Sequence, residues 1–358
     1  MADALPPVGR LLIYRMGSLG DTVVALPAFH MLARRFAGAE RRVLTNFPVN
    51  SDAAPIQSVL DGSGLAHGYF PYPVGARHPG GLLALRRAIA AWKPDLAVYL
   101  TPREGLALWR DLLFLRLCGV PRTVCAPTRR ELRQWKTGNH GLRESEASRL
   151  ARCVAEIGDI DLADPAAWSL GLTAAERAAA ARALDGWAGA DRFAAFSIGA
   201  KVAVKEWGDA RWAELLAALS ARHPGLGLAM VGGPNDGPRS EAAARGWRGP
   251  AIDLCGALPP RHSACVIARA RFFLGHDSGP MHLAASVGTP SIGIFGTLSP
   301  PGIWFPFGAR HRVFYPGLPW SGGEPPVFRD AAGEADITQI PVAPVLAACE
   351  TLLLGDAA

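Results

Sequence analysis

The chain has 358 residues, of which 49% are apolar and 19% charged, and its formal net charge is +6 at pH 7. This composition excludes a disordered or fibrous chain, and the length exceeds what one hydrophobic core usually serves, so two domains of ordinary size are expected. No apolar run approaches the roughly 18 to 20 uncharged residues of a membrane-spanning helix, and residues 1–10 lack the pattern of a signal peptide, so we expect a cytoplasmic protein.

Short apolar runs alternate with helical patterns along the first half of the chain, which is typical of parallel sheets with crossover helices. Strands are predicted over residues 10–16, 41–47 and 95–100. Helices are predicted over residues 21–36, 81–92 and 107–117. Pro27 should disturb the first helix early, because it removes the hydrogen bond back to Val23. The stretch DIDLADPAAWSLGL then loses the periodicity, which indicates a linker and a domain boundary near residue 165.

The second half repeats this plan after an Ala-rich helix predicted over residues 173–187. Strands are predicted over residues 193–199, 226–233, 251–256, 271–277 and 290–296. Residues 302–333 are expected to be loop, and residues 342–354 an amphipathic helix. The sequence thus predicts an α/β protein with domains over residues 1–165 and 166–340, facing one another across a cleft. The C-terminal residues 341–358 could pack back on the N-terminal domain.

The positive charge lies in the first half, because residues 1–185 hold 23 Lys and Arg against 17 Asp and Glu, whereas residues 186–358 hold 14 of each. Its densest part is PRTVCAPTRRELRQWK, which contains Arg129, Arg130 and Arg133. A solvated Arg-rich surface would explain this charge, and so would an anionic partner. No nucleic-acid-binding motif accompanies the segment, so a phosphorylated lipid or sugar, or an anionic membrane surface, is the better match.

A glycine-rich turn follows the first predicted strand in YRMGSLGDTVVALPAFHML. It carries Arg15, Ser18 and Asp21, with glycines that allow positive φ and close approach of a ligand. The following helix start favours anionic groups. Asp21 either caps this helix or acts as a general base, and the sequence leaves both roles open.

A second corner lies in HDSGPMHLAASVGTPSIGIFG. Asp277 ends a predicted buried strand, and Ser278 and Gly279 supply backbone N–H groups at a helix start, a geometry that suits a diphosphate. His282 lies close to the same face of the first helical turn. It is either a structural histidine or a ligand contact.

Two further loops follow predicted strands of the second half. Lys201 and Lys205 lie in SIGAKVAVKEWGD, where an ammonium could neutralise a leaving phosphate without a metal, although loop lysines are usually just solvated. Asp236 lies in VGGPND, which is either a plain turn or a carboxylate for ribose hydroxyls.

Neither the carboxylates nor the cysteines predict a metal site. The one Asp-x-Asp motif, formed by Asp159 and Asp161, lies in the linker and is expected to be a solvated turn. The six cysteines contain no CxxC pair, so buried thiols are expected rather than zinc ligands or disulfides.

In this order and spacing, the motifs RMGSLGDTVVALPAFHML, AKVAVKEW, VGGPND and HDSGPMHLAASVGTPSIGIFG resemble glycosyltransferase family 9, the bacterial heptosyltransferases of lipopolysaccharide core synthesis and their relatives. The resemblance covers nearly the whole chain, and its two corners are the specific part. It implies a GT-B fold with two Rossmann-like domains, the first for the acceptor and the second for the donor. The implied reaction is an inverting, metal-independent transfer of a sugar, heptose from ADP-heptose above all, to a lipopolysaccharide-type or other cell-envelope glycan.

By matching positions, the resemblance makes Asp21 the base, Lys205 the phosphate-contacting lysine and Asp236 the residue at the ribose. The remaining donor-side residues would be Lys201, Asp277, Ser278, Gly279 and His282, and the acceptor-side residues Arg15, Ser18, Arg129, Arg130 and Arg133. No cofactor or metal is implied besides the nucleotide sugar. The family's loop commonly reads Lys-x-Trp-Pro, whereas this chain has Lys205-Glu206-Trp207-Gly208, so the choice between Lys201 and Lys205 stays open.

Other activities fit the same architecture. A GT-B nucleotide-sugar epimerase would also place a carboxylate beside a nucleotide sugar, and a family 9-like transferase could use a different sugar. A nicotinamide oxidoreductase is disfavoured, because no GxGxxG follows the first strand. A noncatalytic sugar-nucleotide binding module would bind the donor without turnover.

Overall fold

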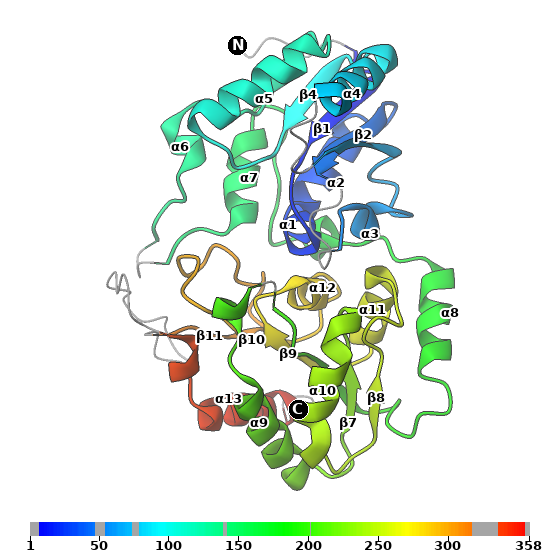
Figure 1. Ribbon diagram of the computed structural model, residues 1–358, viewed down its shortest axis with the longest axis vertical. Helices are drawn as coiled ribbons and strands as arrows, with labels where there is room; N and C mark the ends of the chain where they lie inside the picture. Colours follow the sequence, from blue (N-terminus) through cyan, green and yellow to red (C-terminus); the bar gives the residue numbers. More distant parts are fainter. Residues whose placement is uncertain are drawn as a thin grey trace. The chain divides into compact units, whose positions relative to one another are not determined.

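The computed structural model describes residues 7–46, 54–73, 79–138, 142–200, 202–316 and 336–354 (Figure 1). The chain forms two compact units: unit 1 comprises Met1–Lys136 and Ser145–Gly171, and unit 2 comprises Thr137–Glu144 and Leu172–Ala358. The boundary therefore lies after Gly171 and not near residue 165 as predicted. The segment 137–144 belongs to unit 2, where the N–H of Arg143 donates to the carbonyl of Pro301 (2.9 Å).

Unit 1 is built on a parallel sheet with the strand order β3-β2-β1-β4-β5. Its strands are β1 (Arg10–Tyr14), β2 (Glu40–Asn46), β3 (Gly68–Tyr72), β4 (Leu96–Tyr99) and β5 (Thr123–Val124). The register pairs Leu12 with Arg42 of β2 and with Ala97 of β4. The three predicted strands are confirmed, whereas β3 and β5 were not predicted because they are edge strands without a long apolar run.

The helices of unit 1 cover both faces of this sheet. They are α1 (Leu19–Val23), α2 (Leu26–Arg35), α3 (Gln57–Leu60), α4 (Pro79–Trp92), α5 (Gly105–Leu117), α6 (Arg130–Arg133), α7 (Glu146–Val154) and the 3₁₀ turn η1 (Pro165–Trp168). Leu12 and Tyr14 pack with α4 and α5 in one core cluster. Leu11 and Ile13 are also fully buried and, by strand alternation, lie on the opposite face. Burial on both sides explains the continuous apolar run of β1.

Unit 2 contains a second parallel sheet, in the order β11-β10-β9-β6-β7-β8. Its strands are β6 (Phe193–Ser197), β7 (Gly227–Met230), β8 (Ala251–Asp253), β9 (Phe272–His276), β10 (Ser291–Ile294) and β11 (Arg312–Phe314). Five of these strands are confirmed predictions. The short edge strand β11 lies in the stretch that was expected to be loop.

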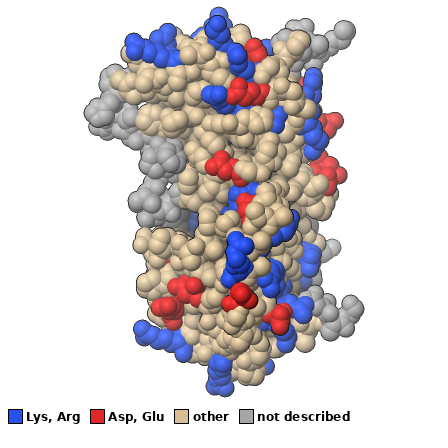
Figure 2. Space-filling view, turned by 90° about the vertical axis from the view of Figure 1, so that its right-hand side faces the viewer, with Lys and Arg blue, Asp and Glu red and all other residues tan. Residues whose placement is uncertain are grey.

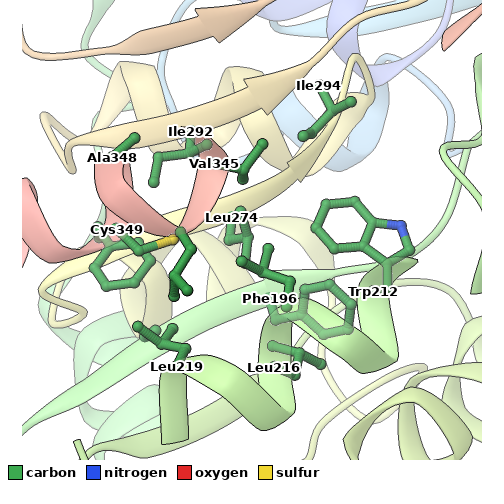
Figure 3. Packing of buried hydrophobic residues seen from close by; sticks show 14 of the residues in the cluster. Phe196, Trp212, Leu216, Leu219, Leu274, Ile292, Ile294, Val345, Ala348 and Cys349 are labelled. Carbon is green, nitrogen blue, oxygen red and sulfur yellow. The ribbon is translucent and has the colours of Figure 1, made fainter. Parts of the chain in front are cut away.

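The helices of unit 2 also lie on both faces of the sheet (Figure 1). They are α8 (Ala174–Ala183), η2 (Ala203–Lys205), α9 (Asp209–Arg222), η3 (Pro234–Asp236), α10 (Gly237–Ala243), η4 (Ala244–Gly246), α11 (Pro260–Ile267), α12 (Gly279–Ser286), η5 (Ile337–Gln339) and α13 (Val342–Leu354). Figure 3 shows Trp212 and Leu216 of α9 and Val345 of α13 packed with Phe196 and Leu274 of the strands. The C-terminal helix thus belongs to the core of unit 2. Its predicted packing on the N-terminal domain stays a prediction.

In each unit the strand order reverses beside the first strand, which is the arrangement of a doubly wound Rossmann-like sheet. The reversal lies between β1 and β4 in unit 1 and between β6 and β9 in unit 2. In open α/β sheets, ligands bind at the carboxyl ends of the strands at this switch point. The loops that follow these four strands are therefore where a site is expected, and they carry both predicted corners.

Candidate functional site

The loops after β6 and β9 meet through an ion pair at the switch point of unit 2. The Lys205 ammonium contacts the Asp277 carboxylate, and the side chains are 16% and 7% exposed. Burial by itself would raise the pKa of the Asp277 carboxyl, but the nearby His282 and Lys205 hold that pKa below its ordinary value. Asp277 is therefore ionised at neutral pH, and it fixes the position of the ammonium.

His276, the last residue of β9, binds the loop that carries Lys205. Its Nε2 accepts the backbone N–H of Trp207 (2.8 Å) and the indole N–H of Trp212 (3.2 Å). Nδ1 must then carry the proton, which it donates to the carbonyl of Ile198 (2.9 Å). Burial lowers the pKa of His276 to about 4, so the ring is neutral at pH 7. Sequence analysis missed this histidine, because its two tryptophan partners lie far from it in the chain.

Trp207 completes the anchor of the altered lysine loop. The side chain is fully buried, and its indole N–H donates to the carbonyl of Ile340 (2.8 Å). The next residue, Gly208, has φ +103°, a conformation that proline cannot adopt. Glu206 is held by Arg239 (2.8 Å), so the loop directs Lys205 toward Asp277. Lys201 lies outside the described residues.

Asp277 is followed by the start of α12, which adds further anion-binding groups. His282 Nε2 lies 3.8 Å from Asp277 Oδ1. Ser278 is the N-cap, and its buried hydroxyl has no hydrogen-bond partner among the described residues. The N–H groups of the first turn, including that of Gly279, have no acceptor within a helix and carry a partial positive charge. The corner thus combines an ammonium, a hydroxyl and a helix N-terminus, a set that suits a diphosphate.

Asp236 lies at the turn after β7, where its carboxylate approaches two backbone segments closely. Its Oδ2 accepts the N–H of Gly233 (2.8 Å). A Cβ atom at Gly199 or at Gly232 would lie 2.5 Å from an Asp236 oxygen, so a side chain at either position would displace this carboxylate. The carboxylate therefore stabilises the turn, as in the plain structural interpretation, beside the loop after β6. No contact tests its predicted role at a ribose.

The corner after β1 positions Asp21 at the third residue of α1. Ser18 is the N-cap of this helix, and Asp21 Oδ2 accepts both its backbone N–H (2.8 Å) and its hydroxyl (2.9 Å). Both of these hydrogen bonds go to Oδ2 of the Asp21 carboxylate. Helix α1 ends at Val23, and α2 has Pro27 in its first turn, which confirms the predicted early break.

Gly17 makes room for this carboxylate. Its φ is +146°, and a Cβ atom there would lie 2.4 Å from the Cβ of Asp21. Any other residue at this position would therefore displace Asp21 or the backbone. The N–H of Gly17 donates to Asn46 Oδ1 at the end of β2 (2.8 Å), which ties the turn to the sheet.

Arg15 has a structural role and not the predicted contact with an acceptor. Its side chain is 1% exposed and donates to the carbonyls of Leu100 and Asp21 (both 2.6 Å). It lies 3.6 Å from the buried carboxylate of Glu146, which also binds Arg149 (2.7 Å). Because breaking a buried charge pair leaves an unpaired ion, this cluster holds the loops after β1 and β4 in place.

The three arginines of the basic segment lie at α6, away from the Asp21 turn in the sequence. Arg129 and Arg130 are exposed, and Arg133 is half-buried. Arg129 lines a cavity of about 640 Å³ together with Arg116, Arg122 and Arg152. On the face drawn in Figure 2, basic and acidic side chains are interspersed, so that face carries no single basic patch among the residues described.

The remaining candidates agree with their structural interpretations. Asp159 and Asp161 are exposed, and Asp161 accepts the N–H of Ala163 (2.8 Å) within a turn. Within the described ranges, no group of three or more His, Cys, Asp or Glu side chains could hold a metal ion. In the same ranges, no helix is both long enough and apolar enough to cross a membrane.

Comparisons with known proteins point to one family of glycosyltransferases. The family model of glycosyltransferase family 9 (heptosyltransferase) matches residues 145–318. Lipopolysaccharide heptosyltransferase 3 of Escherichia coli is 31% identical over 156 residues, which cover 42% of this chain and 43% of that protein. The match thus spans less than half of the curated relative's length.

Solved structures resemble the chain over nearly its full length. A family 9 glycosyl transferase from Veillonella parvula superposes with a TM-score of 0.74 at 18% identity and covers 97% of this chain and 98% of its own. The E. coli heptosyltransferase WaaC with ADP-2-deoxy-2-fluoro heptose gives 0.65 at 18% identity, over 95% and 99% of the two chains. The predicted α/β fold of the GT-B class and the resemblance to family 9 are confirmed.

Proposed function

We propose that this chain, a heptosyltransferase-like protein of glycosyltransferase family 9, transfers a sugar from a nucleoside-diphosphate donor to a glycan acceptor of the cell envelope. The observation that carries the proposal is the Lys205–Asp277 pair in front of α12, at the switch point of unit 2. It lies inside the range 145–318 that the family model matches. A lysine ammonium held in place at a ligand-binding edge of the sheet is what a diphosphate site needs.

In this proposal the donor diphosphate binds at the Asp277 corner. Lys205 and the N–H groups of Ser278 and Gly279 contact its oxygens, and His282 contacts the sugar or the phosphate. Asp236 lies at the turn after β7 for the ribose hydroxyls. An ADP-linked heptose is the first candidate donor, because a similar solved structure contains an ADP-heptose analogue.

The proposed reaction is one direct displacement at the anomeric carbon. The acceptor oxygen attacks that carbon, the bond to the diphosphate oxygen breaks, and the configuration is inverted. The acceptor proton passes to Asp21 Oδ1, and the charge that develops on the leaving diphosphate is stabilised by Lys205 and by the N-terminus of α12. This arrangement requires no metal ion, so transfer in the presence of EDTA is the expected result.

The acceptor is proposed to be a lipopolysaccharide-type glycolipid, because the curated relative is a lipopolysaccharide heptosyltransferase. Arg129, Arg130 and Arg133 offer positive charge to a phosphorylated acceptor or to an anionic membrane surface. We therefore propose that the enzyme works on the cytoplasmic side of the inner membrane, without a nucleic-acid partner.

A panel of ADP-, GDP-, UDP- and dTDP-sugars tests the donor site by thermal shift. A ligand that binds only the folded protein stabilises it by about 2.7 kcal/mol at a concentration 100 times its dissociation constant. We expect ADP-heptose to give the largest shift and the Lys205→Ala variant to lose it. If no nucleotide sugar shifts the transition, or if Lys205→Ala responds like the wild type, the donor assignment is wrong.

Turnover then separates a transferase from an epimerase. Donor is incubated with and without a deacylated lipopolysaccharide core, and the products are followed by NMR, which reports the anomeric configuration. The proposal expects donor consumption only with the acceptor, and an inverted linkage. An isomeric nucleotide sugar formed without any acceptor would identify an epimerase instead, whereas a retained configuration would contradict the single displacement.

A further inference from the structure

Helix α5 of unit 1 is apolar on both of its faces. Its inner residues, Leu108 and Leu115, are buried in the core cluster that covers the sheet. The opposite face of an ordinary surface helix would be polar. In α5 that face instead carries four large apolar side chains: Leu106, Trp109, Leu113 and Leu117.

These four side chains are strongly exposed and form one stripe. Their exposed fractions are 89%, 61%, 59% and 54%, in chain order. Their spacing of three, four and four residues brings them to one side of the helix, over roughly 17 Å at 1.5 Å per residue. Single exposed leucines are ordinary, but a contiguous apolar stripe marks a surface that binds something. Figure 1 shows α5 along the outside of unit 1.

Arginines border the stripe. Arg110 and Arg116 lie on the same exposed face, and Arg86 of α4 donates to the carbonyl of Leu117 (2.8 Å) at the end of the helix. Arg116 also lines the cavity of about 640 Å³, whose wall includes Arg122. The stripe therefore has positive charge along it and at its carboxyl end.

The acid within α5 offsets only part of this charge. Asp111 is buried, and its carboxylate is bound by Arg103 (2.9 Å) and Arg110 (3.1 Å). The Tyr99 hydroxyl donates to the same carboxylate (3.0 Å). The acid thus faces inward and holds Arg103 and Arg110 at the base of the exposed face.

We propose that the outer face of α5 docks unit 1 on an anionic phospholipid bilayer. Trp and Leu side chains that enter the headgroup region, bordered by arginines that meet lipid phosphates, are the pattern of an interfacial helix. A second copy of the chain is a poorer occupant, because a two-fold contact through this face would bring the same arginines together. This docking does not depend on the sugar-transfer reaction. It would attach the protein to the membrane through apolar contacts as well as through charge.

Vesicle co-sedimentation of the full chain, without donor or acceptor, tests the proposal. We expect the wild type to bind mixed phosphatidylcholine and phosphatidylglycerol vesicles more tightly than pure phosphatidylcholine vesicles. The double variant Trp109→Ser/Leu113→Gln should bind both kinds about tenfold more weakly or worse, because the apolar contribution is lost. Arg110→Gln/Arg116→Gln should reduce the preference for anionic vesicles, and Leu354→Gln, which removes a similarly exposed leucine from α13, should bind like the wild type.

The variants are checked for folding by circular dichroism and for donor binding, which they should retain because all four positions are on the surface. Wild-type protein that binds neither kind of vesicle overturns the proposal, and so does a Trp109→Ser/Leu113→Gln variant that binds normally. Sedimentation velocity addresses the rival occupant. A wild-type dimer that this double variant converts to monomer would identify the face as a protein interface instead. Failure of vesicle binding leaves nucleotide-sugar transfer unaffected, so the two proposals fail separately.

Discussion

Substitution of Asp21 by Asn separates the structural role of this residue from its proposed chemical role. In the folded protein, Asp21 Oδ2 accepts two hydrogen bonds from Ser18, one from the N–H (2.8 Å) and one from the hydroxyl (2.9 Å). The Asn side chain keeps an amide oxygen in the same place, so it can preserve these bonds. It cannot take up the acceptor proton. Asp21→Asn therefore removes the base and leaves most of the turn.

The two roles predict effects of different size. Loss of the negative charge in the first turn of α1 should cost about 0.3–1 kcal/mol of folding free energy, and Asp21→Ala, which also removes both hydrogen bonds, about 0.5–2 kcal/mol. Loss of a general base should lower turnover by about 10²–10⁴. At 1.36 kcal/mol for each factor of ten, that corresponds to about 2.7–5.4 kcal/mol in the barrier. The catalytic effect should therefore exceed the effect on stability.

Three measurements on each variant test this difference: initial rates at saturating donor, donor affinity by calorimetry, and thermal denaturation. Ser18→Ala is the matched control, because it removes the hydroxyl donor and leaves the carboxylate. We expect Asp21→Asn and Ser18→Ala to melt at similar temperatures and to bind the donor normally. Only Asp21→Asn should lose turnover. If Asp21→Asn keeps its turnover, or if Ser18→Ala loses as much, Asp21 is a capping residue and the base lies elsewhere.

Three further predictions concern unit 2. Lys205→Ala should weaken donor binding or turnover by about 1.5–3 kcal/mol because it removes a charge-assisted contact, whereas Lys201→Ala, measured by the same calorimetry, should do much less; the reverse order would refute the assignment of Lys205. Asp277→Ala should weaken donor binding itself, and normal calorimetric affinity would remove the diphosphate from this corner. Burial lowers the pKa of His276 from 6.5 to about 4, so the unfolded chain binds a proton more readily than the folded protein does. The free energy of unfolding should therefore fall by about 3 kcal/mol as the pH drops from 6.5 to 4. The melting temperature of His276→Gln should depend less on pH over this range, and an unchanged slope would contradict this prediction.

Much of the fold could be predicted because its central strands are buried on both faces. Four consecutive residues of β1 (11–14) and of β6 (193–196) are buried and apolar or aromatic, and such a run identifies a parallel strand from local sequence alone. The edge strands β3, β5 and β11 were missed, since an edge strand needs no such run. Pro71 lies within β3, and β5 has only two residues. These segments become strands because a neighbour is there to pair with them.

Some residues of the candidate site could also be predicted from the local sequence, whereas others could not. Asp277 and Asp21 could be found because each lies in a glycine-rich turn directly after a predicted strand, and such turns can be recognised from the local sequence. His276 could not be assigned, because its role depends on Trp207 and Trp212, which reach it from 69 and 64 residues away. Arg15 was placed with the acceptor for the same reason: the sequence does not contain the burial that Glu146 and Leu100 create around it.

The sequence by itself determined the two Rossmann-like halves, the corner that carries Asp21 and the corner that carries Asp277, because these features follow from local periodicity and turn chemistry. Only the tertiary structure showed that Lys205 meets Asp277. It also decided that α13 belongs to unit 2 and that α5 exposes an apolar face. The physical reason is that burial and partner choice are properties of residues far apart in the chain. The apolar pattern from Leu106 to Leu117 by itself predicts a helix buried on all sides. In the folded protein the sheet covers only one face of this helix, and the other face stays exposed.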